Sequence, residues 1–223
     1  MRVQLIKYTD MPDYTAALAA RICYSSSSQI GLTNEKVKNL IKKILKSGHL
    51  SVLEHISFTY LIEGISRVTT HQLVRHRLAS YSQQSHRYTK IEENKFVCPP
   101  DIQNDKKAYD IYEKATKDAI KTYNKLIEMG IKKEDARYII PQAVTSNIMV
   151  TMNARELLHF FTLRCCKRAQ WEIREVANEM LRLAKQKAPI IFENAGPACV
   201  RGRCPEEKPC KNIKEIRNFF KEL

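Results

Sequence analysis

The chain has 223 residues, enough to bury a hydrophobic core as one domain. Its formal net charge of +14 at pH 7 favours anionic partners, which include nucleic acids, nucleotides and dinucleotides. No secretory signal or bilayer-length apolar run is found, and the seven cysteines are an odd number, so we expect a cytoplasmic protein with free thiols and no membrane partner.

The first third of the chain alternates between strand and helix patterns. Residues 1–8 predict a strand, and residues 12–23 and 34–46 predict helices. The second helix has an apolar stripe and is followed by Gly48, a plausible helix stop. Alternating apolar residues between Ile56 and Ile62 predict a half-buried strand that ends at Gly64.

A helix predicted over residues 66–78 would place Gln72 one turn before His76, and His71 one turn before Arg75. We then expect a loop over residues 80–87 and a short strand over 96–98.

The second half of the chain is predicted to be mainly helical. Helices are expected over residues 105–128 and 134–140, and a strand over 148–152. Asn153 is a suitable cap for the next helix, in which Leu157, Leu158 and Phe161 would pack while Arg155 and His159 share another face. The last major helix is expected over residues 170–187. Strands interleaved with helices predict a mixed α and β protein.

Residues 75–87 contain three arginines, two histidines, three serines and two glutamines, with only three apolar side chains. So polar a run is not expected in the core, and guanidinium groups suit phosphate or carboxylate ligands. A merely solvated basic loop is the alternative.

Five of the six histidines lie between residues 49 and 86, which raises the possibility of a metal site. The neighbouring Arg75 and Arg77 would repel a cation, so we expect no metal site.

The ordered polar blocks between residues 48 and 172 resemble the flavin-dependent thymidylate synthases. The signature is Arg75-His76-Arg77, then seven residues, then Ser85. The other matching blocks, in the same order as in that family, are Gly48-His49, Glu54-His55, Gln72, Arg87, Asn153-Ala154-Arg155, Arg164 and Ala169-Gln170-Trp171-Glu172.

The resemblance implies two sets of binding residues. The residues matched to FAD binding are His49, Ser51, Glu54, Arg75, His76, Arg77, Gln83, Asn153 and His159. Those matched to dUMP binding are Gln72, Arg75, Gln83, Gln84, Ser85, Arg87, Arg137 and Arg164. Within the second set, Arg87 and Arg137 would bind the phosphate. Arg164 would be catalytic, because a cation at the uracil carbonyl edge stabilises negative charge that develops on the ring.

The implied reaction is reductive methylation of dUMP to dTMP. In this family 5,10-methylenetetrahydrofolate is the carbon donor, reduced FAD the hydride donor and NADPH the reductant, without an enzymic nucleophile. Ser85 has a second interpretation as a nucleophile, which would require a general base such as His86 within reach.

The resemblance also implies an α+β fold with an antiparallel sheet flanked by helices, assembled as a homotetramer with active sites between subunits. We expect one domain over residues 1–223. Its tail, from about residue 199, contains Cys199, Cys204 and Cys210, which are either structural thiols or a metal or redox group.

A basic nucleic-acid-binding module is the alternative function. It has the right charge, but the arginines lie among amide and hydroxyl groups rather than along an aromatic-studded stripe. We therefore expect no nucleic-acid partner.

Overall fold

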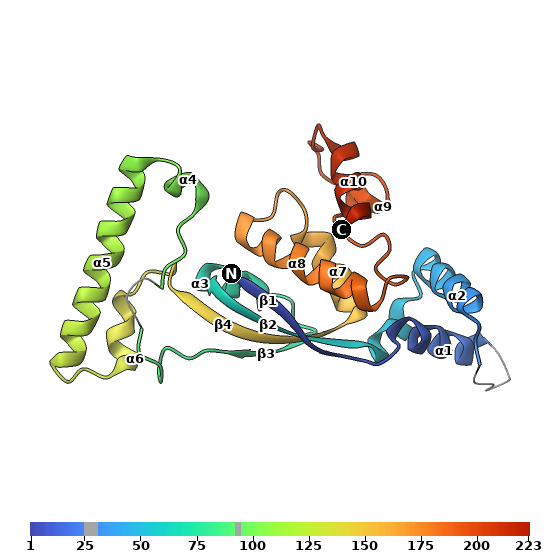
Figure 1. The fold of residues 1–223 in the computed structure, drawn as a ribbon, viewed down its shortest axis with the longest axis horizontal. Helices are drawn as coiled ribbons and strands as arrows, with labels where there is room; N and C mark the ends of the chain where they lie inside the picture. The colour runs from blue at the N-terminus through green and yellow to red at the C-terminus, as the bar shows by residue number, and fades with distance from the viewer. Residues whose placement is uncertain (25–30, 92–94) are drawn as a thin grey trace. The chain divides into compact units, whose positions relative to one another are not determined.

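The computed structural model describes residues 1–24, 31–91 and 95–223 (Figure 1). The strands are β1 (Arg2–Tyr8), β2 (Ser57–Ser66), β3 (Ala79–Gln83) and β4 (Thr145–Asn153). The longer helices are α1 (Pro12–Tyr24), α2 (Asn34–Ser47), α3 (Arg67–Leu73), α5 (Lys106–Glu128), α7 (Ala154–Arg164), α8 (Trp171–Lys187) and α10 (Ile213–Glu222). Short helices are η1 (Leu50–His55), α4 (Pro100–Gln103), α6 (Lys133–Ala136), η2 (Arg137–Ile139) and α9 (Ala198–Arg201).

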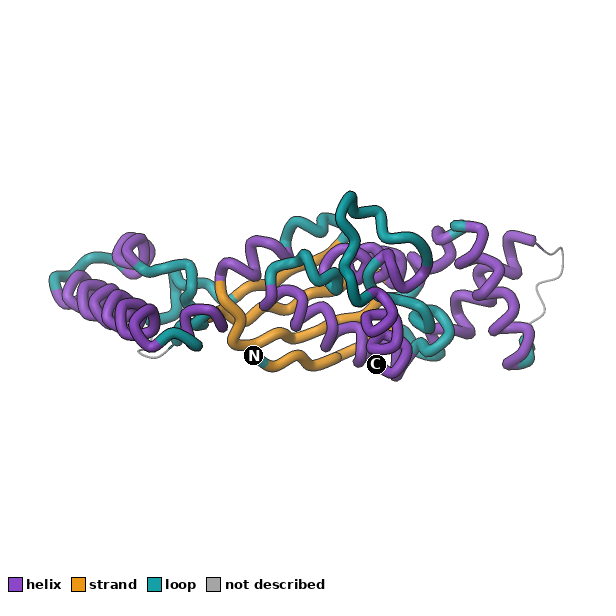
Figure 2. Tube along the Cα trace, turned by 90° about the horizontal axis from the view of Figure 1, so that it is seen from above, coloured by secondary structure: helices purple, strands orange, loops and turns teal. Residues whose placement is uncertain are grey.

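The four strands lie side by side in one antiparallel sheet (Figure 2). Their order in the sheet is β1-β2-β4-β3. Between β2 and β4 the hydroxyls of Thr59 and Thr151 are 2.9 Å apart, and further on the Gly64 N–H donates to Asn147 Oδ1 at 3.0 Å. Residue numbers therefore rise along one strand and fall along the other. The expected α+β fold with an antiparallel sheet is confirmed.

The chain divides into two compact units. The first unit comprises Met1–Arg2, Ile62–Arg75 and Ser82–Met149. The second unit comprises Val3–Leu61, His76–Tyr81 and Val150–Leu223. The polar run of residues 75–87 is divided between the units. Arg75 and residues 82–87 belong to the first unit, and residues 76–81 belong to the second.

The first unit packs its core along one face of the long helix α5. Ile91, Ile120, Tyr123, Ala136 and Val144 are buried there. Asp105 caps the helix by accepting the Ala108 N–H at 3.1 Å. The Tyr112 hydroxyl of α5 donates to the Val97 carbonyl at 2.9 Å, which fixes the segment that approaches the sheet.

The second unit has an aromatic core between its strands and the helices α7 and α8. The ring of Phe192 packs edge-on against Phe58 and Phe161, with centroids 5.6 and 5.8 Å apart. The Tyr60 hydroxyl of β2 donates to the Met180 carbonyl of α8 at 3.3 Å. These contacts hold α7, which carries Glu156, His159 and Arg164, against the sheet.

Helix caps explain why several boundaries agree with the sequence. Asn153 caps α7 by accepting the Glu156 N–H at 2.9 Å, as predicted. Gly48 ends α2 in the left-handed conformation with φ of 73°, as its position suggested. Leu157, Leu158 and Phe161 are buried, whereas Arg155 and His159 are exposed.

Three predicted elements differ from the structure. Helix α3 ends at Leu73 rather than at residue 78, and the chain turns at Val74 and Arg75, so Gln72 and His76 do not share a helical face. Residues 79–83 form the strand β3 rather than part of a loop. The segment expected as a strand at 96–98 is reduced to an isolated bridge between Phe96 and Val144.

None of the helices formed by described residues has the length and apolar character needed to cross a membrane.

Candidate active site

Gln83 is held by two hydroxyl groups in the first unit. Its Nε2 donates to Thr70 Oγ1 at 3.0 Å and to Ser146 Oγ at 3.1 Å. Thr70 lies on α3, which begins at the cap residue Ser66, and Ser146 lies on β4. The amide of Gln83, on β3, thus links this strand to α3 and β4. Its nitrogen already makes two hydrogen bonds within the protein when no ligand is bound.

Arg87 has a carboxylate partner on α6. Its Nε lies 2.5 Å from Glu134 Oε2, and both side chains are partly exposed. The Glu134 carbonyl in turn accepts the Nε–H of Arg137 at 3.1 Å. Glu134 therefore links the two arginines that were predicted to bind a phosphate.

A third arginine, Arg67, for which no role was predicted from the sequence, lies close to Arg137. The pKa of Arg67 is lowered by burial and by the neighbouring charge of Arg137. The buried imidazole of His86 also has a lowered pKa, because of burial and then the charge of Arg67, while a hydrogen bond with the Thr145 backbone opposes this shift. Arg67 and Arg137 are thus close enough for their charges to interact, and an anion bound to both would be stabilised there.

Ser85 lies beside this basic group, and its hydroxyl accepts the Arg87 N–H at 3.2 Å. The ring of His86, the only base adjacent in sequence, is engaged with the Thr145 backbone. This arrangement favours the interpretation of Ser85 as a binding residue over that of a nucleophile.

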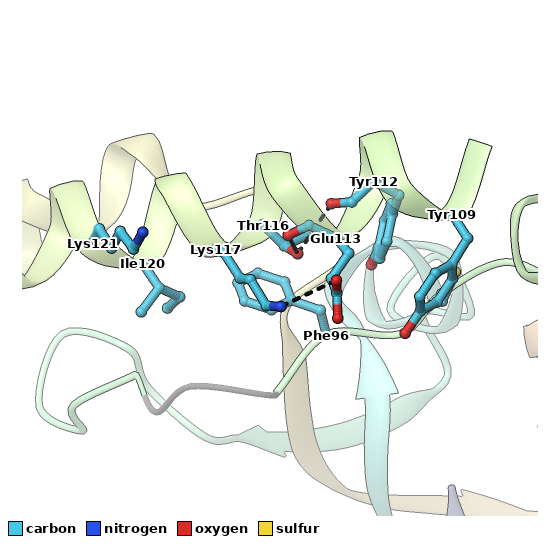
Figure 3. A pocket seen from close by; sticks show the side chains of 9 residues that line it. Phe96, Tyr109, Tyr112, Glu113, Thr116, Lys117, Ile120 and Lys121 are labelled. Carbon is cyan, nitrogen blue, oxygen red and sulfur yellow. Dashed lines mark hydrogen bonds and ion pairs between the residues drawn. The ribbon is translucent and has the colours of Figure 1, made fainter. Parts of the chain in front are cut away.

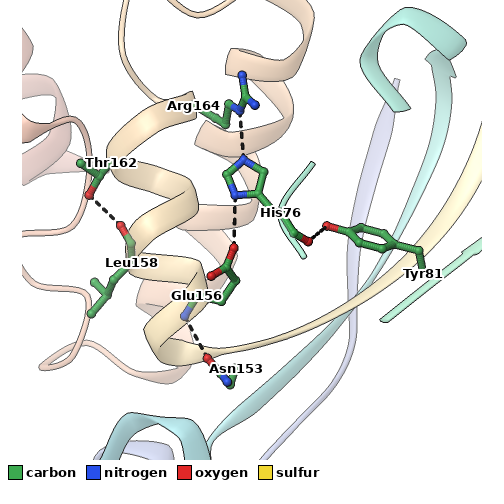
Figure 4. Close-up of polar contacts among 7 residues, drawn as sticks. All are labelled: His76, Tyr81, Asn153, Glu156, Leu158, Thr162 and Arg164. Carbon is green, nitrogen blue, oxygen red and sulfur yellow. Dashed lines mark hydrogen bonds and ion pairs between the residues drawn. The ribbon is translucent and has the colours of Figure 1, made fainter. Parts of the chain in front are cut away.

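In the second unit, His76 lies between a carboxylate and a guanidinium group (Figure 4). Its Nδ1 is 3.2 Å from Glu156 Oε1, and its Nε2 accepts the Nε–H of Arg164 at 3.0 Å. The imidazole is only 4% exposed and Glu156 only 6%. Both ring nitrogens of the residue predicted to contact FAD are therefore occupied by protein groups.

The surroundings of His76 keep its ring neutral. Burial, followed by the charges of Arg164 and His159, lowers the pKa of His76 to about 4. Burial raises the pKa of Glu156 and lowers that of Arg164. The expectation that the run 75–87 stays out of the core is wrong for His76 and His86, which bury their rings because each finds hydrogen-bond partners inside its unit.

His49 and Ser51 line a cavity of about 410 Å³ in the second unit. Arg155, which was predicted to share a helix face with His159 and was given no binding role, lines the same cavity. Its Nη1 lies 2.5 Å from Glu54 Oε1. An imidazole, a hydroxyl and a guanidinium group suit the phosphates of a dinucleotide, so the donors present here fit FAD.

The predicted residues thus fall in both units. Gln72, Arg75, Gln83, Gln84, Ser85, Arg87 and Arg137 belong to the first unit, and His49, Ser51, Glu54, His76, Arg77, Asn153, His159 and Arg164 to the second. Asn153 is occupied as a helix cap. The side chains of Arg75, Arg77, Gln84 and His159 are exposed.

Another cavity, of about 330 Å³, lies along α5 in the first unit (Figure 3). Phe96, Tyr109 and Tyr112 line it together with the ion pair of Glu113 and Lys117, whose charged atoms are 3.1 Å apart. None of the residues predicted to bind a ligand lines this cavity.

The cysteine tail is also in the second unit. Cys199 is buried, and its pKa is raised by burial and by the neighbouring thiols Cys204, Cys166 and Cys210. Among residues 1–24, 31–91 and 95–223, no group of three or more histidine, cysteine or acidic side chains is arranged to hold a metal ion.

The fold and these sites define a basic α+β protein whose guanidinium groups are arranged for anionic ligands. A family model described as "Thymidylate synthase complementing protein" matches residues 4–190. The chain is 47% identical to the flavin-dependent thymidylate synthase of Geobacter sulfurreducens, covering 100% of this chain and 99% of that protein. It is 49% identical to the enzyme of the same name from Pyrococcus abyssi, covering 100% and 98%.

A solved structure of a UMP/dUMP methylase, PolB from Streptomyces cacaoi bound with 5-Br dUMP, matches with a TM-score of 0.80 at 25% identity, covering 86% of this chain and 93% of that one. The chain belongs to the flavin-dependent thymidylate synthase family.

Proposed function

We propose that this protein converts dUMP to dTMP by reductive methylation, with 5,10-methylenetetrahydrofolate as carbon donor, FAD as cofactor and NADPH as reductant. The observation that carries the proposal is the basic group of Arg67, Arg87 and Arg137: Arg67 lies within reach of the charge of Arg137, and Glu134 contacts both Arg87 and Arg137. Sequence identity of 47% and 49%, over the full length of this chain, to two enzymes named flavin-dependent thymidylate synthase supports the reaction.

In this proposal the first unit binds the phosphate of dUMP. Arg87 and Arg137 would each donate to phosphate oxygens, with Ser85 and the neighbouring Gln84 at the same turn. One guanidinium and phosphate pair at about 4 Å gains on the order of 4 kcal/mol at an effective dielectric constant near 20, before the cost of desolvation. Several arginines are therefore needed to hold a nucleotide against water.

The second unit would hold FAD through the cavity lined by His49, Ser51 and Arg155. When bound and reduced, FAD supplies the hydride. The contribution of the chain is to bind the anionic groups of the cofactor and to keep Arg155 in place through its ion pair with Glu54.

Arg164 would act at the pyrimidine ring. Addition of a hydride to the ring moves negative charge onto a carbonyl oxygen, and a guanidinium group fixed near that oxygen stabilises the charge as it forms. No nucleophilic side chain is then required, which agrees with the engaged state of Ser85 and His86.

We further infer that the protein assembles as a homotetramer with active sites between subunits, as the resemblance implies. We also infer that it acts in the cytoplasm. Large apolar side chains exposed on the first unit support association with other copies: Ile111 is 72% exposed and Tyr138 is 84% exposed. Light scattering coupled to size-exclusion chromatography measures this directly, and a monomer at micromolar concentration would contradict it.

The reaction is tested with the purified protein. We expect a yellow preparation whose flavin absorbance bleaches under anaerobic NADPH, and dTMP formation that requires both dUMP and 5,10-methylenetetrahydrofolate. A colourless preparation that forms no dTMP after addition of FAD, and that shifts DNA at low salt, would favour the nucleic-acid-binding alternative.

A further inference from the structure

Glu156 and His76 are arranged as a support for Arg164. We propose that they are positioning residues: Glu156 orients the His76 imidazole, and the imidazole holds the guanidinium group of Arg164 in the plane required for catalysis. The inference rests on the proposed function, because it gives a role to side chains that stand behind the arginine expected at the pyrimidine ring.

The two hydrogen bonds of the imidazole are donated in the same direction, from Arg164 to His76 and from His76 to Glu156. Arg164 donates its Nε–H to His76 Nε2 at 3.0 Å, so this nitrogen must carry a lone pair. The proton of the neutral ring then sits on Nδ1, which donates to Glu156 Oε1 at 3.2 Å. The carboxylate thus selects the one tautomer that can accept a hydrogen bond from Arg164.

The spacing on α7 makes this arrangement specific. Glu156, Phe160 and Arg164 follow one another at intervals of four residues, so they lie on one face of the helix. The His76 ring spans this face from the carboxylate to the guanidinium group (Figure 4). Phe160 packs edge-on against the ring, with centroids 4.9 Å apart. The Tyr81 hydroxyl donates to the His76 carbonyl at 2.8 Å and fixes the backbone on the other side.

The charges around His76 favour the same state. The titratable groups that face the ring are Glu156, His159 and Arg164 from α7, with Tyr81 from β3 bonded to its backbone. Burial and the charge of Arg164 keep the ring neutral at physiological pH, since the pKa of His76 is lowered to about 4. A protonated ring would present an N–H toward the Nε–H of Arg164 and break the contact.

A purely structural role would need no arginine at the end of the chain of contacts. Buried histidines with two partners stabilise many cores. Here the second partner of His76 is Arg164, which is proposed to stabilise charge at the pyrimidine. The orientation of the Arg164 guanidinium group depends on that of the imidazole to which it donates. Loss of the support should therefore lower the rate of the chemical step more than the affinity for dUMP.

The test compares two substitutions of His76 in the FAD-loaded enzyme. In His76→Gln the amide oxygen can accept from Arg164 and the amide nitrogen can donate to Glu156, so kcat for dTMP formation should stay within about threefold of wild type. In His76→Leu neither bond forms, and kcat should fall by about 10- to 100-fold while the dissociation constant for dUMP changes less than about threefold.

A double-mutant cycle with Arg164→Ala links the effect to the arginine. If His76 acts through Arg164, His76→Leu should cause little further loss in the Arg164→Ala background, measured by single-turnover formation of dTMP. Equal loss in both backgrounds would overturn the proposal. Loss of FAD from His76→Leu, with kcat restored by added FAD, would overturn it in favour of a direct contact with the cofactor.

Tyr60→Phe is the control for a general loss of stability. It also removes a buried hydrogen bond in the second unit, from Tyr60 to the Met180 carbonyl, but has no link to Arg164. Its kcat should equal that of wild type. The proposed function and this inference fail differently: wild-type protein that forms no dTMP refutes the reaction, whereas active wild type with an equally active His76→Leu variant refutes only the positioning role.

Discussion

Arg87 and Glu134 form an ion pair, with Nε 2.5 Å from Oε2, at the place where a phosphate is proposed to bind. The guanidinium group is thus partly neutralised before dUMP arrives. A phosphate must share Arg87 with this carboxylate or displace it, and Glu134 would repel the phosphate in either case.

Glu134→Gln should therefore strengthen dUMP binding. Both partners of the pair are partly exposed, so the gain is expected to be no more than about 1 kcal/mol, or roughly fivefold in affinity. Isothermal titration of the FAD-loaded enzyme with dUMP measures it. Glu113→Gln is the matched control, since Glu113 forms an ion pair with Lys117 on α5 and should leave the affinity unchanged. Weaker binding by Glu134→Gln would mean that the carboxylate holds Arg87 in its binding position.

Arg87→Ala should weaken dUMP binding more than FAD binding. A charge-assisted hydrogen bond contributes about 1.5 to 3 kcal/mol, so a loss of roughly 10- to 100-fold is expected. Deoxyuridine, which lacks the phosphate, should bind wild type and variant equally. If dUMP affinity is unchanged, Arg87 does not belong to the phosphate site.

Gln83 connects three elements of the first unit, and its replacement tests a structural role separately from a ligand role. Gln83→Met leaves Thr70 and Ser146 without their donor and should lower the free energy of unfolding by about 1 to 3 kcal/mol. In Gln83→Glu the two hydroxyls can rotate and donate to the carboxylate, so most of that stability should return. Urea denaturation of the two variants gives the comparison, and equal stability of Gln83→Met and wild type would contradict the structural role.

The parts of the fold that the sequence predicted are those determined by short-range chemistry. The caps Asn153 and Gly48 and the amphipathic stripe of α2 depend on neighbouring residues only. The strand β3 was missed because its residues are mostly polar and become a strand only through pairing with β4. The helix α10 was not identified either, although Ile216 and Phe220 recur at helical spacing and are buried.

The candidate site shows the same limit. Matching motif positions identified His76, Glu54 and Arg164, but not how their side chains are used. The burial of His76 depends on Glu156 and Arg164, which lie about eighty and ninety residues away in the chain. Arg67 and Arg155 lacked a role for the same reason, since their importance follows from neighbours that only the folded chain supplies.

The buried neutral His76 should make stability fall in mildly acidic solution. Its pKa is about 4 in the folded chain and about 6.5 when unfolded, so the unfolded chain binds more protons between these values. The contribution of this residue is fully present above pH 6.5 and is lost as the pH falls toward 4, by about 3 kcal/mol. The free energy of unfolding should therefore fall less steeply over this interval in His76→Gln than in wild type. Parallel curves would show that His76 is not buried as a neutral ring.

Arg155 provides the sharpest test of the proposed FAD site, because it lines the cavity with His49 and Ser51 and was not predicted to bind the cofactor. Arg155→Ala removes a guanidinium group suited to a phosphate, so the purified variant should retain much less FAD, with the dissociation constant raised by roughly 10- to 100-fold. Arg182→Ala is the matched control, since Arg182 also forms an ion pair between partly exposed side chains, with Glu179, but lines no part of this cavity. Flavin fluorescence after dialysis measures both variants. Because the ion pair with Glu54 is proposed to keep Arg155 in place, Glu54→Gln should also weaken FAD binding, but less than Arg155→Ala. Full FAD occupancy in Arg155→Ala would move the cofactor away from this cavity.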